Sequence, residues 1–115
     1  MYKPYQVPRS WATRAGDIDS CKVKVTDDLS KAIDAKIVMA TWNGLGARVI
    51  GINGMKVVSN VGKDHDLSYD EFAVPLNLIK PGVNTCFTYS NTKHHGIEVM
   101  WPGMVLMVKY NKPEG

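Results

Sequence analysis

The chain has 115 residues, of which 44% are hydrophobic and 22% are charged, so it can form one domain with its own core and does not have the composition of a disordered protein. Its net charge is only +3 and its lysines are scattered, which argues against a nucleic-acid-binding surface. No apolar run is long enough to span a bilayer, which argues against a membrane protein.

The first twenty residues differ in pattern from the rest. They contain Pro4 and Pro8, and prolines interrupt a helix because they lack a backbone N–H. We therefore expect residues 1–20 to form an extended arm, which Trp11 packs onto the following domain. No signal peptide is visible in this stretch, although a module within a longer chain would show none either.

Residues 21–111 are predicted to form one β domain, followed by a tail at 112–115. Short apolar or alternating segments recur there, and turns rich in Gly, Pro and Asn separate them. The predicted strands, about eight in number, cover residues 21–25, 34–42, 48–52, 55–58, 72–78, 83–89, 97–101 and 104–110. The segment 34–42 is largely apolar on both faces from Ile37 to Trp42, which predicts a central strand. The longest break, residues 59–70, is predicted to be a functional or mobile loop. This pattern is typical of an all-β, two-sheet antiparallel sandwich.

Two turn motifs stand in the middle of this domain. Asn53-Gly54 predicts a type I′ hairpin, because that turn needs positive φ at both central residues. Pro81-Gly82 predicts a turn of another type. The order of Ile52-Asn53-Gly54, a polar loop and Ile79-Lys80-Pro81-Gly82-Val83-Asn84 resembles the galactose-binding-like jelly roll of carbohydrate-binding modules and of the N-terminal domains of family-two glycoside hydrolases. The resemblance covers roughly residues 35–110 and implies a jelly-roll sandwich more than it implies a function, because a fold does not determine function.

The resemblance also bears on Asp17 and Asp19, which stand at alternate positions in a polar turn. Calcium prefers oxygen ligands such as carboxylates. Galactose-binding-like modules often carry a structural calcium near their N-terminal loops. The resemblance thus makes Asp17 and Asp19 candidate ligands of a structural calcium, and the alternative is a turn without metal.

The two cysteines, Cys21 and Cys86, lack the CxxC spacing of metal or redox sites. Each lies in an apolar segment that is predicted to be a strand. One alternative is a pair of buried free thiols. The other is a disulfide between an early and a late strand, which requires an oxidising compartment.

The sequence carries no signature of catalysis. It has no glycine-rich phosphate loop, zinc-ligand spacing or nucleophile elbow. His65 between two aspartates and the pair His94-His95 are predicted to be solvated loop residues rather than metal ligands. Glu98 is the only glutamate inside a predicted strand, whereas glycoside hydrolysis needs two facing carboxylates. We therefore expect a protein that is not an enzyme.

Sugar recognition needs no reaction chemistry. An aromatic ring covers the apolar face of a pyranose, and polar side chains reach its hydroxyls. Trp42 and Trp101 each end a predicted strand next to a glycine-bearing loop, where such a platform would lie; the alternative is that both pack in the core or at its rim. Arg48 and Glu98 would bind hydroxyls if they share a sheet face, and would otherwise face solvent as an ion pair. The candidate ligand-binding residues are Trp42, Asn43, Arg48, Tyr89, His94, His95, Glu98 and Trp101.

The sequence and the resemblance together predict a non-catalytic carbohydrate-binding module. It would bind polysaccharide or oligosaccharide and be ancillary to a glycan-active enzyme, with a catalytic domain in the same parent chain. We expect such a module to be secreted or extracellular as part of a larger protein, with no nucleic-acid or membrane partner. The alternative is a structural or protein-interaction sandwich without a sugar ligand, which would use an apolar patch around Trp101, Pro102 and Met104.

Overall fold

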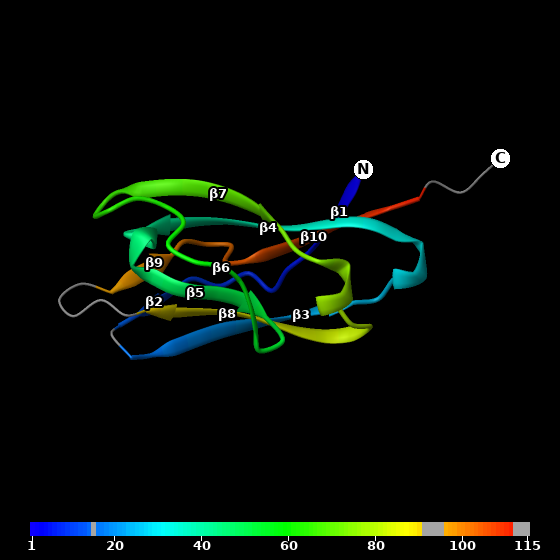
Figure 1. Ribbon diagram of the computed structural model, residues 1–115, viewed down its shortest axis with the longest axis horizontal. Helices are drawn as coiled ribbons and strands as arrows, with labels where there is room; N and C mark the ends of the chain where they lie inside the picture. Colours follow the sequence, from blue (N-terminus) through cyan, green and yellow to red (C-terminus); the bar gives the residue numbers. More distant parts are fainter. Residues whose placement is uncertain (15, 91–95, 112–115) are drawn as a thin grey trace.

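The computed structural model describes residues 1–14, 16–90 and 96–111, and consists of two antiparallel sheets packed face to face (Figure 1). The larger sheet has the order β1-β10-β4-β9-β2, with β7 on the other side of β4. Its strands are β1 (Tyr2–Tyr5), β2 (Trp11–Thr13), β4 (Ala32–Trp42), β7 (Leu67–Ala73), β9 (Ile97–Val99) and β10 (Val105–Tyr110). The smaller sheet has the order β3-β8-β5-β6 and consists of β3 (Ile18–Val25), β5 (Ala47–Ile52), β6 (Met55–Val58) and β8 (Gly82–Ser90). Short 3-10 turns lie at Leu29–Lys31, Gly44–Gly46 and Leu76–Leu78. The prediction of an all-β two-sheet sandwich is confirmed, with ten strands in the described residues.

The larger sheet is built around β4, which has eleven residues. Residues 36–42 pair with β7 along one edge of β4. Along the other edge, residues 32–38 pair with β10 and residues 41–42 pair with β9. The prediction that this segment is a central strand is confirmed. Because β10 and β9 share one edge of β4, β9 and its neighbour β2 lie at the end of the sheet where β4 finishes (Figure 1).

The core lies between the sheets and comes from alternate residues of their strands. Ile37 of β4 faces inward from the larger sheet, and Val23 of β3 and Ile50 of β5 face inward from the smaller one; all three are fully buried. Burial of each such side chain stabilises the fold by about 1.5–3 kcal/mol. Cys21 and Cys86 also lie in the core, directly opposite each other on β3 and β8, and both are free thiols.

The two turn motifs form as the sequence predicted, and a hydrogen bond joins them. Asn53 and Gly54 both have positive φ, 52° and 80°, which is the type I′ geometry. Gly82 also has positive φ, at 82°. The side-chain amide of Asn53 donates to Oδ1 of Asn84 at 2.8 Å and to the carbonyl of Leu78 at 2.8 Å. The hairpin and the later turn therefore hold each other in place.

The largest differences from the predicted strand boundaries lie around β7. β7 begins at Leu67, inside the segment predicted as a loop over 59–70, and residues 76–78 form a 3-10 turn where a strand was predicted. The outward-facing residues of β7 are exposed and include Leu67 and Tyr69, whereas Ser68 and Asp70 are turned inward at the margin of the sandwich. Because these inward-facing residues are polar, the segment lacks the apolar alternation by which a strand is predicted from sequence. β7 ends just before Pro75, which has no N–H for the ladder.

The N-terminal segment contributes two strands to the larger sheet. β1 pairs with β10, and β2 pairs with β9. Trp11 of β2 is buried, and its indole N–H donates to Oγ1 of Thr88 on β8 at 3.0 Å. This bond connects the two sheets and satisfies the one polar atom of the buried ring.

Candidate functional site

A groove runs over the outer face of the larger sheet, where β2 and β9 lie side by side. It consists of two adjoining hollows of about 240 and 430 Å³, and the larger one lies within the roughly 300–1,000 Å³ of ordinary ligand sites. Ala12 and Glu98 line both hollows, so the two hollows form one continuous groove, which we call the β2–β9 groove. The first hollow is lined by Ala12, Arg14, Trp42, Gly96, Ile97 and Glu98, and the second by Ser10, Trp11, Ala12, Glu98, Val99, Met100 and Trp101.

Strand register places the central residues of the groove abreast. Glu98 of β9 is the partner of Trp42 on one side and of Ala12 on the other. Partners in an antiparallel pair point to the same face, so these three side chains share the outer face. Their neighbours Thr41 and Val99 face the core and are buried. The side chains that line the centre of the groove are therefore the outward-facing residues of three neighbouring strands.

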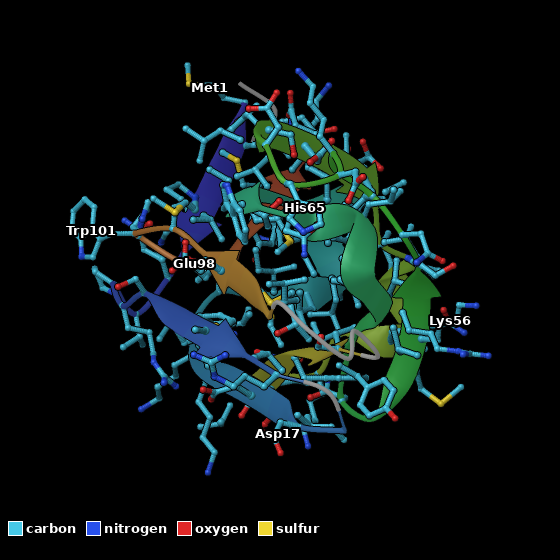
Figure 2. The ribbon with its side chains drawn as sticks, turned by 90° about the vertical axis from the view of Figure 1, so that its left-hand side faces the viewer. Met1, Asp17, Lys56, His65, Glu98 and Trp101 are labelled. Carbon is cyan, nitrogen blue, oxygen red and sulfur yellow. The ribbon has the colours of Figure 1, made fainter. Side chains whose placement is uncertain are left out.

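Trp101 is the most exposed aromatic ring at the groove. β9 ends at Val99, so Trp101 lies in the turn that follows rather than in the predicted strand over 97–101. Its side chain is 68% exposed, and Figure 2 shows it projecting from the body of the protein close to Glu98. An aromatic ring this exposed has a free face for a ligand.

Trp42 is half-buried, and neighbouring residues hold it in place. Its ring meets the ring of His65 edge-on, with centroids 5.6 Å apart and planes at 86°. His65 is positioned in turn by Asn43, whose Oδ1 accepts from the backbone N–H of His65 at 3.0 Å. The amide of Asn43 donates to the carbonyl of Gly96 at 3.3 Å, and Asn43 is only 3% exposed. Asn43 thus positions the groove but does not face a ligand.

Two opposite charges face the first hollow. Glu98 and Arg14 are both exposed, and neither forms an ion pair within the described part of the chain. Gly96 lies in the same hollow, and its lack of a side chain leaves room there. A Cβ at this position would lie 2.6 Å from the carbonyl oxygen of Thr13 and 3.3 Å from Cγ of Arg14. Their carboxylate and guanidinium groups are free to accept and donate hydrogen bonds.

Sequence reasoning missed Arg14 as a site residue. A signal for it existed in the segment Trp11-Ala12-Thr13-Arg14, where Trp11 and Thr13 are buried and the other two are exposed. This alternation places Arg14 on the same face as Ala12. The prolines nearby favoured an extended arm instead, which concealed the short strand.

The remaining candidates do not join the groove. Arg48 on β5 and Tyr89 on β8 belong to the smaller sheet, so Arg48 does not share a sheet face with Glu98 and forms no ion pair with it. Tyr89 is half-buried and pairs with residues of β3 and β5. His94 and His95 lie outside the described residues.

The candidate calcium ligands lie away from the groove. Figure 2 shows Asp17 on a different side of the molecule from Glu98 and Trp101. Asp19 accepts from its neighbour Ser20 N–H at 2.7 Å and lies 3.4 Å from the Arg9 guanidinium. Calcium takes six to eight oxygen ligands, and among the described residues no three potential metal-binding side chains gather together. These residues fit calcium poorly, and the calcium site stays a prediction.

No known protein family matches the chain, and no curated protein matches its sequence. Within the described residues, no helix is long and apolar enough to cross a membrane.

Proposed function

We propose that this protein is a non-catalytic carbohydrate-binding domain of the galactose-binding-like jelly-roll type, and that the β2–β9 groove is its binding site. The observation that supports the proposal is the gathering of two tryptophans and two free charged groups around one groove. A tryptophan covers the apolar face of a pyranose, while a carboxylate and a guanidinium reach its hydroxyls. Trp101 supplies the exposed ring, and Glu98 and Arg14 supply the polar contacts.

The groove favours binding over hydrolysis. Glu98 is the only carboxylate among the described residues that line it, and hydrolysis of a glycosidic bond requires a second one about 5–10 Å away. A domain of this kind increases the local concentration of a linked catalytic domain at its polymer, because the second contact becomes intramolecular. We therefore propose that the parent chain also contains a glycan-active catalytic domain and that the whole protein works outside the cell.

Affinity electrophoresis tests the proposal. Native gels cast with xylan, mixed-linkage glucan, galactomannan or pectic galactan should retard the wild-type protein in at least one case, relative to a gel without polysaccharide. Trp101→Ala should weaken that binding by at least about tenfold, because aromatic anchors commonly contribute more than 1.4 kcal/mol. Tryptophan fluorescence should also change when the same glycan is added.

A matched variant on the other sheet provides the control. Ile18 is 65% exposed, almost as much as Trp101, and lies on β3 of the smaller sheet. Ile18→Ala should migrate like the wild type in every gel. Equal migration of all three proteins in all gels, or equal retardation of wild type and Trp101→Ala, would contradict the proposed groove.

A protein-interaction role is the second candidate, and the exposure of Met100 and Trp101 favours it. The patch predicted from the sequence does not form as such, because Met104 is fully buried. Sedimentation velocity at rising concentration separates the two functions. Self-association that Trp101→Ala abolishes, without any glycan binding, would support the interaction role instead.

A further inference from the structure

The outer face of the larger sheet continues past the groove onto β7. Tyr69 pairs with Ala40 of β4, and Leu67 pairs with Trp42, so both side chains of β7 share the face that carries Trp42 and Glu98. Tyr69 is 65% exposed and Leu67 58%. Large apolar residues that remain uncovered on one face of a sheet mark an interaction surface.

A single strand, β4, separates Tyr69 from the groove, and its side chain at this point is small. Residues 41–42 of β4 pair with β7 on one side and with β9 on the other, so β4 lies between these strands. The backbone N–H of Met100 donates to the carbonyl of Ala40 at 2.8 Å, which places Met100 across β4 from Tyr69. Since neighbouring strands lie about 4.8 Å apart, the backbones of Tyr69 and Met100 are about 10 Å apart. Only the small side chain of Ala40 stands between them on this face.

Two exposed aromatic rings therefore flank Ala40. Tyr69 lies on one side, and Trp101, the residue after Met100, lies on the other. Because Tyr69 and the turn that carries Trp101 lie on opposite sides of β4, the two rings would not both stack on one pyranose, but they can contact different rings of one chain. Glu98 and Trp42 lie beside the line between them and can contact the intervening sugar units.

Building on the proposed function, we infer that the ligand is an extended glycan chain of several sugar rings, laid across β7, β4 and β9, with Tyr69 as a second stacking platform. A monosaccharide or a chain terminus would use Trp101 and the groove alone. The chain runs roughly perpendicular to the strands, because its two aromatic contacts lie on opposite sides of β4. Tyr69 then determines preference for ligand length rather than the basic ability to bind sugar.

Calorimetric titration with oligosaccharide ladders tests this inference. The probes are glucose, xylose, mannose and galactose, and their β-1,4-linked oligomers of two to six rings. For whichever ladder binds, wild-type Kd should fall by at least about tenfold between the dimer and the hexamer. Tyr69→Ala should bind the hexamer about tenfold more weakly and the dimer unchanged, whereas Tyr69→Phe, which keeps the ring, should behave like the wild type.

The outcomes distinguish this inference from the function on which it rests. Equal Kd values for dimer and hexamer in the wild type, or an equal loss for both in Tyr69→Ala, would overturn the extended chain while leaving the groove as a sugar site. Binding to none of the probes and to none of the gel polysaccharides would overturn the proposed function, and this inference with it. Ile18→Ala serves again as the control and should retain the wild-type length dependence.

Discussion

Replacing Asn84 with alanine should remove one of the main constraints on the fold. Asn84 is fully buried on β8. Its Oδ1 accepts from the backbone N–H of Lys80 at 2.9 Å and from the amide of Asn53 at 2.8 Å. Its Nδ2 donates to the carbonyls of Lys80 and Gly82, at 2.8 and 3.1 Å. One side chain thus closes the turn at 80–82 and joins it to the Asn53-Gly54 hairpin.

The cost follows from these four hydrogen bonds. Each bond contributes about 1 kcal/mol net, and the N–H of Lys80 would lose its partner in a partly buried place, which costs more than a lost exposed bond. Water entering the vacated space would recover part of the loss. We therefore expect Asn84→Ala to lower the free energy of unfolding by roughly 3–5 kcal/mol, a large share of the 5–15 kcal/mol typical of a domain.

Equilibrium unfolding in urea, followed by tryptophan fluorescence, measures this loss. With an m-value of about 2 kcal/mol/M, the midpoint should fall by roughly 2 M urea. Asn77→Ala is the matched control, since Asn77 is exposed in a 3-10 turn; it should change stability by less than about 0.5 kcal/mol. If both variants unfold at the same urea concentration, the reasoning about Asn84 is refuted.

Three further predictions concern acid stability, thiol reactivity and the groove. Hydrogen bonds from Lys3 and then Tyr5 hold the pKa of Asp27 below its ordinary value of 3.8, so its stabilisation is present above that pH and is lost as pH falls through the lowered pKa. Asp27→Asn should therefore melt below the wild type at pH 7, and the gap should narrow in acid; a constant gap would contradict this. The hydrogen bond between the two cysteines raises the pKa of Cys86 and lowers the pKa of Cys21, but both thiols are buried and out of reach of a reagent in solution. Ellman's reagent should therefore label the protein only after unfolding, and labelling of the native protein would contradict this. Gly96→Ala would place a Cβ 2.6 Å from a backbone carbonyl oxygen of β2. This substitution should lower the free energy of unfolding by about 1–3 kcal/mol and weaken the retardation of the protein by glycan. An unchanged melting temperature would show that β2 shifts to accommodate the methyl group without cost.

Local pattern was sufficient to predict most of the fold. Apolar and alternating segments located seven of the ten strands in the described residues, and the segment 34–42 was correctly predicted to be a central strand. Asn53-Gly54 specified its hairpin because few other residues tolerate positive φ at both positions. Three strands were missed or misplaced: β7, because polar residues turn inward at the margin of the sandwich, and β1 and β2, because they are only four and three residues long and lie in a segment with prolines.

The candidate site was predictable only in part. Trp42, Glu98 and Trp101 were identified from residue type and position, and the fold brings all three to one groove. Arg48 and Tyr89 had equally suitable chemistry but lie on the smaller sheet. Residue type indicates which side chains can bind a sugar, but it does not indicate which of them are neighbours.

By itself the sequence determined the class of fold, its hairpin and turn positions, and which residues of each strand share a face. Tertiary structure alone decided that Glu98 lies between Trp42 and Ala12, and that Tyr69 lies across β4 from the turn that carries Trp101. The physical reason is that alternation is set by adjacent residues along one strand, whereas strand order and register depend on hydrogen bonds between segments far apart in the chain.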